Sequence, residues 1–101
     1  MITITLICAA GLSTSMLMER MKEAAEKRKL DVYIQAMPES KFQSDDIYTD
    51  ILLLGPQVSY LLEKMKKEYE SKGIRVLAID MIDYGMMDGD TVLTKALTEK
   101  K

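Results

Sequence analysis

The chain has 101 residues, of which 48% are hydrophobic and 30% are charged, a composition typical of a soluble globular protein, and this length predicts one domain spanning residues 1–101. Fourteen Lys and Arg residues against sixteen Asp and Glu residues give a formal net charge of −2, which argues against nucleic acid and anionic lipid as partners. No apolar stretch approaches the roughly 20 residues that cross a bilayer, so we expect no direct membrane insertion.

The first half of the chain predicts two strands and one long helix. Ile2–Cys8 is β-branched and apolar, as in a buried strand. Residues 9–15 are small and polar and predict a loop, and apolar residues then recur at helical spacing through Met16–Lys29. Leu30–Met37 alternates as a second strand, and the polar segment Pro38–Asp46 predicts a loop with a short helical turn.

The second half predicts two further strands and two helices. Asp50–Leu54 is a buried third strand, ended by Gly55 and Pro56. A long helix follows from Val58 to Tyr69, and Gly73 suits the position that closes it. The last three segments predict a strand, a loop or short helix, and a helix: Ile74–Ile79, Asp80–Gly89 and Asp90–Lys101.

This alternation predicts a three-layer α/β/α fold around a four-stranded parallel sheet. Right-handed crossovers place helices on both faces, which fits the continuous apolar strands. We expect the strand order 2-1-3-4. Ligands of such sheets bind at the carboxyl ends of the strands where the winding reverses, which here is between the first and third strands. That point collects the loop after Cys8 and the loop at residues 55–57.

The chain contains one cysteine and no histidine. A single cysteine forms no internal disulfide, which fits the reducing cytoplasm, so we expect a cytoplasmic protein. The missing histidine excludes Ser-His-Asp triads, Cys-His dyads and most catalytic zinc sites. We expect neither a metal nor another cofactor.

The segment after the first strand has the composition of an anion-binding loop. Cys8 ends the strand, and the candidate phosphate-binding residues follow it: Ala9, Ala10, Gly11, Leu12, Ser13, Thr14 and Ser15. The N–H groups of such a loop and the start of the next helix can hold a phosphate, and the same donors favour a thiolate. From the residues alone, a phosphoryl-accepting Cys8 and a buried structural cysteine are about equally supported.

Three segments resemble the lactose/cellobiose-type enzyme IIB of the sugar phosphotransferase system: CAAGLSTSMLMERM, LLLGPQVSYLLEKM and IDMIDYGMMDGDTVL. The resemblance covers essentially the whole chain. It implies a phosphatase-like cysteine loop and a protein-phosphohistidine–sugar phosphotransferase with a phosphocysteine at Cys8. It also implies two partners: enzyme IIA, which donates from a phosphohistidine, and the membrane permease enzyme IIC, which holds a sugar of the β-glucoside/cellobiose, chitobiose or lactose type.

The resemblance also assigns residues outside the first loop. It gives a second loop at residues 55–57 and a third around Tyr84-Gly85 and Asp88-Gly89. The candidate pocket-wall residues are Gly55, Pro56, Gln57 and Tyr84. For Tyr84 and Tyr60 we favour packing, and for Asp80 and Asp88 a capping or turn role over a metal site. Several methionines are expected near the active face: Met16, Met18, Met81, Met86 and Met87.

Two other classes of protein compete with this interpretation. A low-molecular-weight tyrosine phosphatase or arsenate reductase shares the cysteine-loop plan, but its loop ends in an arginine that clamps phosphate. Here the first arginine is Arg20, inside the predicted helix, and a reductase would need further cysteines. A flavodoxin-like or receiver-like binding module would need aromatic flanks or an acidic strand end, whereas the third strand ends in Leu54-Gly55.

Overall fold

The computed structural model describes residues 1–8, 12–45 and 47–98. Its centre is a four-stranded parallel sheet in the order β2-β1-β3-β4, which confirms the predicted order. The strands are β1 (Ile2–Cys8), β2 (Val32–Pro38), β3 (Ile51–Leu54) and β4 (Arg75–Ala78). The two inner strands of the sheet are β1 and β3, so Cys8, the last residue of β1, ends a central strand.

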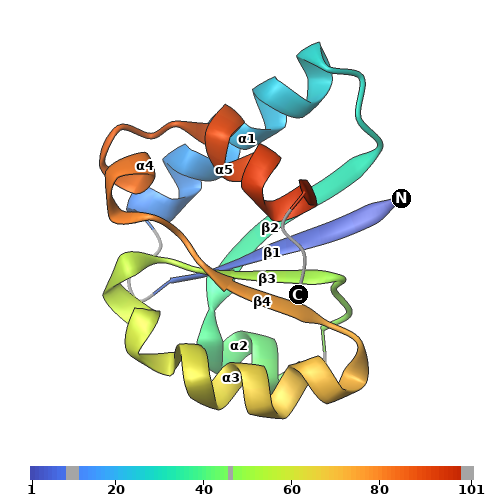
Figure 1. The fold of residues 1–101 in the computed structure, drawn as a ribbon, viewed down its shortest axis with the longest axis vertical. Helices are drawn as coiled ribbons and strands as arrows, with labels where there is room; N and C mark the ends of the chain where they lie inside the picture. Colours follow the sequence, from blue (N-terminus) through green and yellow to red (C-terminus); the bar gives the residue numbers. More distant parts are fainter. Residues whose placement is uncertain (9–11, 46, 99–101) are drawn as a thin grey trace.

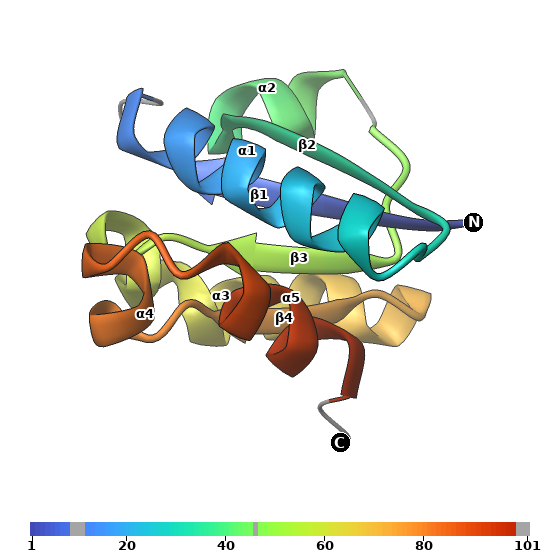
Figure 2. The ribbon, with the colours of Figure 1, turned by 90° about the horizontal axis from the view of Figure 1, so that it is seen from above.

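Helices cover both faces of the sheet, as the predicted three-layer architecture requires (Figures 1 and 2). One face carries α1 (Leu12–Lys27), α4 (Met81–Gly85) and α5 (Gly89–Thr98). The other carries α2 (Glu39–Ser44), the 3-10 segment η1 (Pro56–Leu61), α3 (Leu62–Tyr69) and the 3-10 segment η2 (Glu70–Lys72). Among the residues described, no helix is both long and apolar enough to cross a bilayer.

Side chains of alternate strand residues point to opposite faces of the sheet and pack into two apolar cores, one on each side. On the α1 side, Ile4 and Leu6 pack with Leu17 and Met21. The core on the α3 side is built from these buried residues: Ile7, Met37, Phe42, Leu52, Leu54, Val58, Met65, Tyr69 and Val76. Each such large side chain contributes roughly 1.5–3 kcal/mol when fully buried, so the two cores fix β1 from both faces.

A buried polar cluster lies among these apolar residues and ties β1 to the chain before β3. The hydroxyls of Thr5 and Thr49, 0% and 2% exposed, lie 2.9 Å apart, with Thr5 donating. The side-chain amide of Gln35 donates to Thr5 at 2.9 Å, and Thr49 lies 3.0 Å from the carbonyl oxygens of Thr3 and Ile51. This cluster therefore links β1, β2 and the start of β3 through buried hydrogen bonds.

Asp50 makes a second polar tie at the same end of the sheet. Its carboxylate accepts the backbone N–H of Thr3 at 2.8 Å and the hydroxyl of Tyr48 at 2.6 Å. These two hydrogen bonds, the Thr3 bond foremost, hold the pKa of the Asp50 carboxyl below its ordinary value.

The helix after β3 differs most from its prediction. A regular helix was expected to include Val58, but the segment starts as 3-10 turns, and Val58 has non-helical angles (φ −122°, ψ 19°). The α-helix therefore begins only at Leu62. Val58 is β-branched, so its χ1 is restricted, and its side chain is buried in the α3-side core. The helix closes as predicted at Gly73, whose φ of 87° is left-handed.

Two other elements also differ from the sequence-based expectation. A complete short helix, α2, replaces the expected turn in the segment after β2, and it buries Phe42. At the start of α1, helical backbone begins at Leu12, four residues before the predicted Met16, so the connection from β1 is shorter than expected.

Candidate functional site

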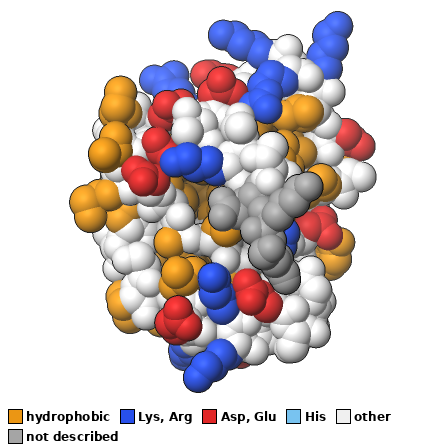
Figure 3. Space-filling model, in the orientation of Figure 1, with side chains coloured by type: hydrophobic (Ala, Val, Ile, Leu, Met, Phe, Trp, Pro, Cys, Tyr) orange, Lys and Arg blue, Asp and Glu red, His pale blue; other side chains and the backbone are white. Residues whose placement is uncertain are grey.

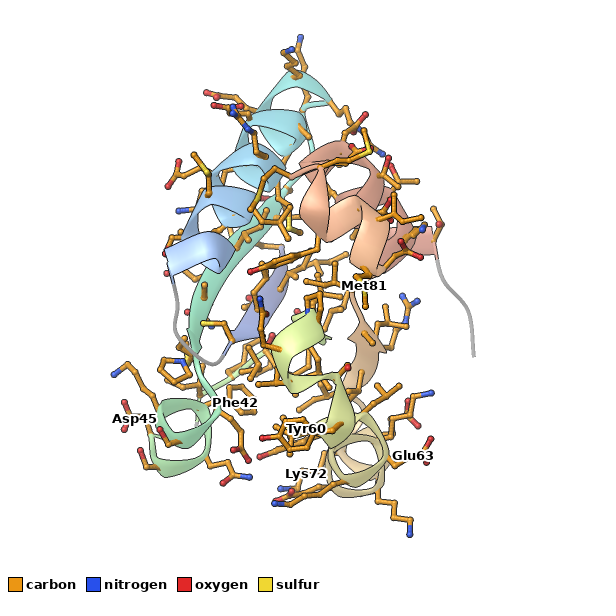
Figure 4. All side chains as sticks on the ribbon, turned by 90° about the vertical axis from the view of Figure 1, so that its left-hand side faces the viewer. Phe42, Asp45, Tyr60, Glu63, Lys72 and Met81 are labelled. Atoms are coloured by element: carbon orange, nitrogen blue, oxygen red, sulfur yellow. The ribbon has the colours of Figure 1, made fainter. Side chains whose placement is uncertain are left out.

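Cys8 is the last residue of β1, at the edge of the sheet where all four strands end. It lies opposite Pro38 in the register with β2, and the preceding Ile7 lies opposite Leu54 of β3. The side chain is only 3% exposed. Figure 4 looks onto this edge of the sheet. Cys8 therefore ends β1 beside the end of β3, at the edge where the sequence predicts a ligand to bind.

The start of α1 follows Cys8 after three residues. Of the predicted phosphate-binding loop, Ala9, Ala10 and Gly11 lie outside the described residues, as do the side chains of Leu12, Ser13 and Thr14. The backbone from Leu12 to Ser15 is the first turn of α1, whereas the sequence placed it in the loop. The first-turn N–H groups of an α-helix have no partner within that helix, and this turn carries no acidic residue, so its positive end suits an anion.

The second predicted loop follows β3 in the chain and is hydrogen-bonded to the end of β1. Gly55 is buried, and its backbone N–H donates to the carbonyl of Ile7 at 3.0 Å, one residue before Cys8. Pro56 is half-buried at the start of η1, and Gln57 is exposed. Gly55 thus fixes the local backbone of β1, while Gln57 is the member of this loop that faces solvent.

The third loop contains two capping aspartates. Asp80 accepts the N–H groups of Ile82 and Asp83 at 2.8 and 3.3 Å, and these bonds lower the pKa of its carboxyl. Asp88 accepts the hydroxyl and N–H of Thr91 at 2.8 and 3.1 Å, which likewise lowers its pKa. The predicted capping roles are confirmed, and no group of three or more acidic or cysteine side chains within the described part of the chain is placed to hold a metal.

The two tyrosines considered for the site lie in different environments. Tyr84 is 8% exposed and belongs to the α1-side core together with Leu17 and Met21, so the packing interpretation is confirmed. Tyr60 is 79% exposed, and the packing interpretation is wrong for it. The prediction relied on the general tendency of tyrosine to be half-buried, and Tyr60 does not lie on the buried side of η1, which carries Val58.

Exposed apolar side chains cluster on the segments around this edge. We call them the edge apolar set: Met16, Tyr60, Met81, Ile82 and Met86, with exposed fractions from 56% to 79%. In Figure 3 apolar side chains gather along the left-hand side, the edge that Figure 4 shows with Tyr60 and Met81 labelled. Of the other methionines expected there, Met18 and Met87 are partly buried against the α1-side core. Ile82 was missed because a five-residue helix carries too little periodicity to show which side is exposed.

A four-stranded parallel α/β sheet whose first strand ends in a cysteine shortly before a helix defines the class of cysteine-loop α/β folds. Two solved structures show this fold at low sequence identity. The lactose-specific IIB domain from Streptococcus pneumoniae superposes with a TM-score of 0.86 at 20% identity, covering 99% of this chain and 98% of that one. A YwlE mutant from Bacillus subtilis superposes with a TM-score of 0.60 at 12% identity, with complete coverage of both chains.

The sequence comparisons narrow this class to one family. The family described as PTS system, Lactose/Cellobiose specific IIB subunit, matches residues 3–95, and the chain belongs to it. The oligo-beta-mannoside-specific EIIB component of Bacillus subtilis (strain 168) is 39% identical over 94% of this chain and 92% of its own. The galactose-specific EIIB component of Lactococcus lactis subsp. cremoris (strain MG1363) is 41% identical over 92% and 91%.

A solved relative agrees with this assignment. The cellobiose-specific IIB component from Borrelia burgdorferi superposes with a TM-score of 0.75 at 34% identity, covering 95% of this chain and 88% of that one. The protein is therefore a IIB component of the lactose/cellobiose type, a phosphotransferase that works with the other components of its sugar transport system.

Proposed function

We propose that Cys8 carries the phosphoryl group, taking it from a phosphohistidine of enzyme IIA and passing it to a sugar bound by the membrane permease, enzyme IIC. The observation that carries this proposal is the position of Cys8, which ends the central strand four residues before α1 begins with no acidic residue in its first turn. The transfer takes place in the cytoplasm, where a free thiol persists.

The chemistry needs little from the chain beyond the thiolate. In the first step Sγ attacks phosphorus, the S–P bond forms, and the P–N bond breaks with its electron pair left on the donor imidazole. In the second step a sugar hydroxyl oxygen attacks the same phosphorus, the S–P bond breaks, and the thiolate leaves while the hydroxyl proton passes to a base on the permease. The chain has no histidine to act as such a base.

The first turn of α1 provides the charge stabilisation. Phosphoryl transfer depends mostly on position and on donors directed at the phosphoryl oxygens. The residues we propose for this cradle are those of the segment from Ala9 to Ser15, with Gly55, Pro56 and Gln57 on the adjacent wall. Gly55 supports the wall through its bond to Ile7.

The position of Arg20 favours a carrier over a phosphatase. A phosphatase loop holds its phosphate with a bidentate arginine at the helix start. Arg20 lies eight residues after Leu12, about 12 Å along the helix axis, and pairs with Glu23 at 3.6 Å. Without such a clamp, the site is better suited to hold a phosphoryl group for transfer than to hydrolyse it.

The edge apolar set supports docking of the donor at this edge. Because Cys8 is 3% exposed, a donor histidine that reaches it must come into close contact with the residues around it. Large apolar side chains on that surface come from Tyr60, from Met81 and Ile82 of α4, and from Met86 just after α4, and methionines adapt readily to more than one partner. The same surface would serve the donor and the permease in turn.

The identity of the sugar is set outside this chain. Three relatives of nearly equal identity, 39%, 41% and 41%, are named for oligo-beta-mannoside, galactose and cellobiose. The sequence of a IIB component therefore does not follow the sugar closely, and we assign specificity to the permease. The expected sugar is of the β-glucoside/cellobiose, chitobiose or lactose type.

The direct test is the variant Cys8→Ser, incubated with phosphorylated enzyme IIA and examined by intact-mass spectrometry. The wild type is expected to gain one phosphoryl group and the variant none, while circular dichroism shows the same fold for both. Phosphorylation of the variant at the wild-type rate would remove Cys8 from the mechanism. Turnover to free phosphate by the wild type would indicate a hydrolase of the phosphatase class.

A further inference from the structure

Gly89 lies where α5 crosses α1, and the crossing leaves no room for a side chain. Gly89 is the first residue of α5 and is buried. A Cβ added to it would lie 2.5 Å from the carbonyl carbon of Arg20 and from the backbone nitrogen of Met21. Helix backbone atoms cannot rotate aside as a flexible side chain can, so a methyl group at position 89 must push the two helices apart.

We propose that Gly89 is a positioning residue: it seats α5 directly on the backbone of α1 and so holds the start of α1 beside Cys8. The proposal rests on the role of Cys8 proposed above. It gives a function to the Asp88-Gly89 pair, in which Asp88 caps α5 and Gly89 permits the close approach. Figures 1 and 2 both show the beginning of α5 alongside α1.

Other contacts hold α5 against α1 and limit how far α5 alone can yield. Arg28 donates from Nη1 to the Asp90 carboxylate at 2.8 Å and to the Thr94 hydroxyl at 2.9 Å. The buried face of α5 belongs to the same core as Leu17 and Met21; its members are Val92, Leu93 and Ala96. A side chain at position 89 would therefore displace α1 as well as α5.

α1 transmits such a displacement to the site because it is continuous and contains no hinge. It runs from Leu12 to Lys27 without an interior glycine or proline. Met21 is about 13 Å from the first residue at 1.5 Å per residue, so a tilt at the crossing moves the first turn as one body. A misplacement of about 1 Å in a transfer site can cost on the order of 100-fold in rate.

The chain offers a matched control for the added methyl group. Gly85 is the last residue of α4, four residues before Gly89. A Cβ added to Gly85 would have nothing within 4 Å. Val76 provides a second control, because it is 1% exposed in the core on the opposite side of the sheet. Val76→Ala lowers stability without touching α1.

The experiment compares Gly89→Ala with Gly85→Ala and Val76→Ala in three measurements. These are the free energy of unfolding, the backbone amide shifts of Cys8 and Ser15 in ¹H–¹⁵N spectra, and the kcat and KM for phosphoryl uptake from phosphorylated enzyme IIA. Gly89→Ala is expected to shift both amides and to lower kcat about tenfold or more, whereas both controls keep the wild-type amide shifts and Val76→Ala keeps the wild-type kcat. If Gly89→Ala does not fold alone, it is measured in a Lys29→Gly background, since Lys29 has a left-handed φ of 54° that glycine relieves.

The outcomes separate this proposal from the proposed function. If Gly89→Ala loses stability as Val76→Ala does but keeps the wild-type amide shifts and kcat, Gly89 is only a packing residue and the proposal fails. Equal effects of Gly85→Ala and Gly89→Ala would also overturn it. If the wild type takes no phosphoryl group, the proposed function fails, and the amide shifts still decide whether Gly89 seats α1.

Discussion

The buried threonine pair gives the most quantitative prediction. Replacing Thr49 by valine keeps its shape but removes a hydroxyl that is 2% exposed. The change deletes the bond that Thr5 donates at 2.9 Å and the bond that Thr49 donates to a carbonyl at 3.0 Å, each contributing about 1 kcal/mol net. It also leaves the Thr5 hydroxyl, 0% exposed, without that acceptor, which costs a further 1–3 kcal/mol or so. Thr49→Val should therefore lower the free energy of unfolding by about 3–5 kcal/mol.

A double-mutant cycle tests the reasoning behind this number. Thr5→Val with Thr49→Val removes both hydroxyls, so no hydroxyl stays buried without its partner, and the half-buried Gln35 can turn to water. Urea unfolding followed by circular dichroism should show the double variant less destabilised than the sum of the single variants. Single-variant losses below about 0.5 kcal/mol, or additivity within about 0.5 kcal/mol, would refute the cluster as a coupled unit.

Three further predictions concern acid stability, backbone strain and the docking surface. The pKa of Asp50 is lower in the folded protein than in the unfolded chain, where it is about 3.9, so the ionised carboxylate stabilises the fold fully above that value and this stabilisation is lost as the pH falls through the folded pKa. The urea concentration at the unfolding midpoint should therefore decrease as the pH is lowered from about 6 to about 3, and it should decrease less steeply in Asp50→Asn. Lys29→Gly should raise the free energy of unfolding by about 0.5–1 kcal/mol in urea titrations, because glycine adopts its φ of 54° without strain; a loss of stability would contradict this. Ile82→Asp should raise the KM for phosphorylated enzyme IIA by roughly fivefold or more at unchanged stability. The control is Tyr33→Asp, which changes an exposed apolar residue of β2 toward the opposite edge and should leave the KM unchanged. Equal effects of the two variants would argue against docking at α4.

The sequence predicted the topology well because the signals were local and strong. Continuous apolar strands such as Ile2–Cys8 and the alternation with helices determine a parallel order, and the sheet has that order. The caps at Asp80 and Asp88 were also predictable, since an aspartate before a helix start has one common use.

What the sequence did not predict depends on contacts between distant residues or on irregular geometry. The 3-10 form of η1 and the non-helical angles of Val58 carry no sign in the sequence, and Val58 is buried in a core assembled from several strands. The close approach of Gly89 to Arg20 and Met21 joins positions nearly 70 residues apart, and a glycine before a helix carries no sign of it. The start of α1 at Leu12 was missed because serine and threonine suit both a loop and a first helical turn.

The most direct test of the central claim is ³¹P NMR of the wild-type protein after incubation with phosphorylated enzyme IIA. The account predicts a thiophosphate resonance that is absent in Cys8→Ser and disappears when permease membranes and the acceptor sugar are added, with sugar phosphate formed in equal amount. A phosphate resonance on a residue other than Cys8, or free inorganic phosphate in place of sugar phosphate, would contradict the account.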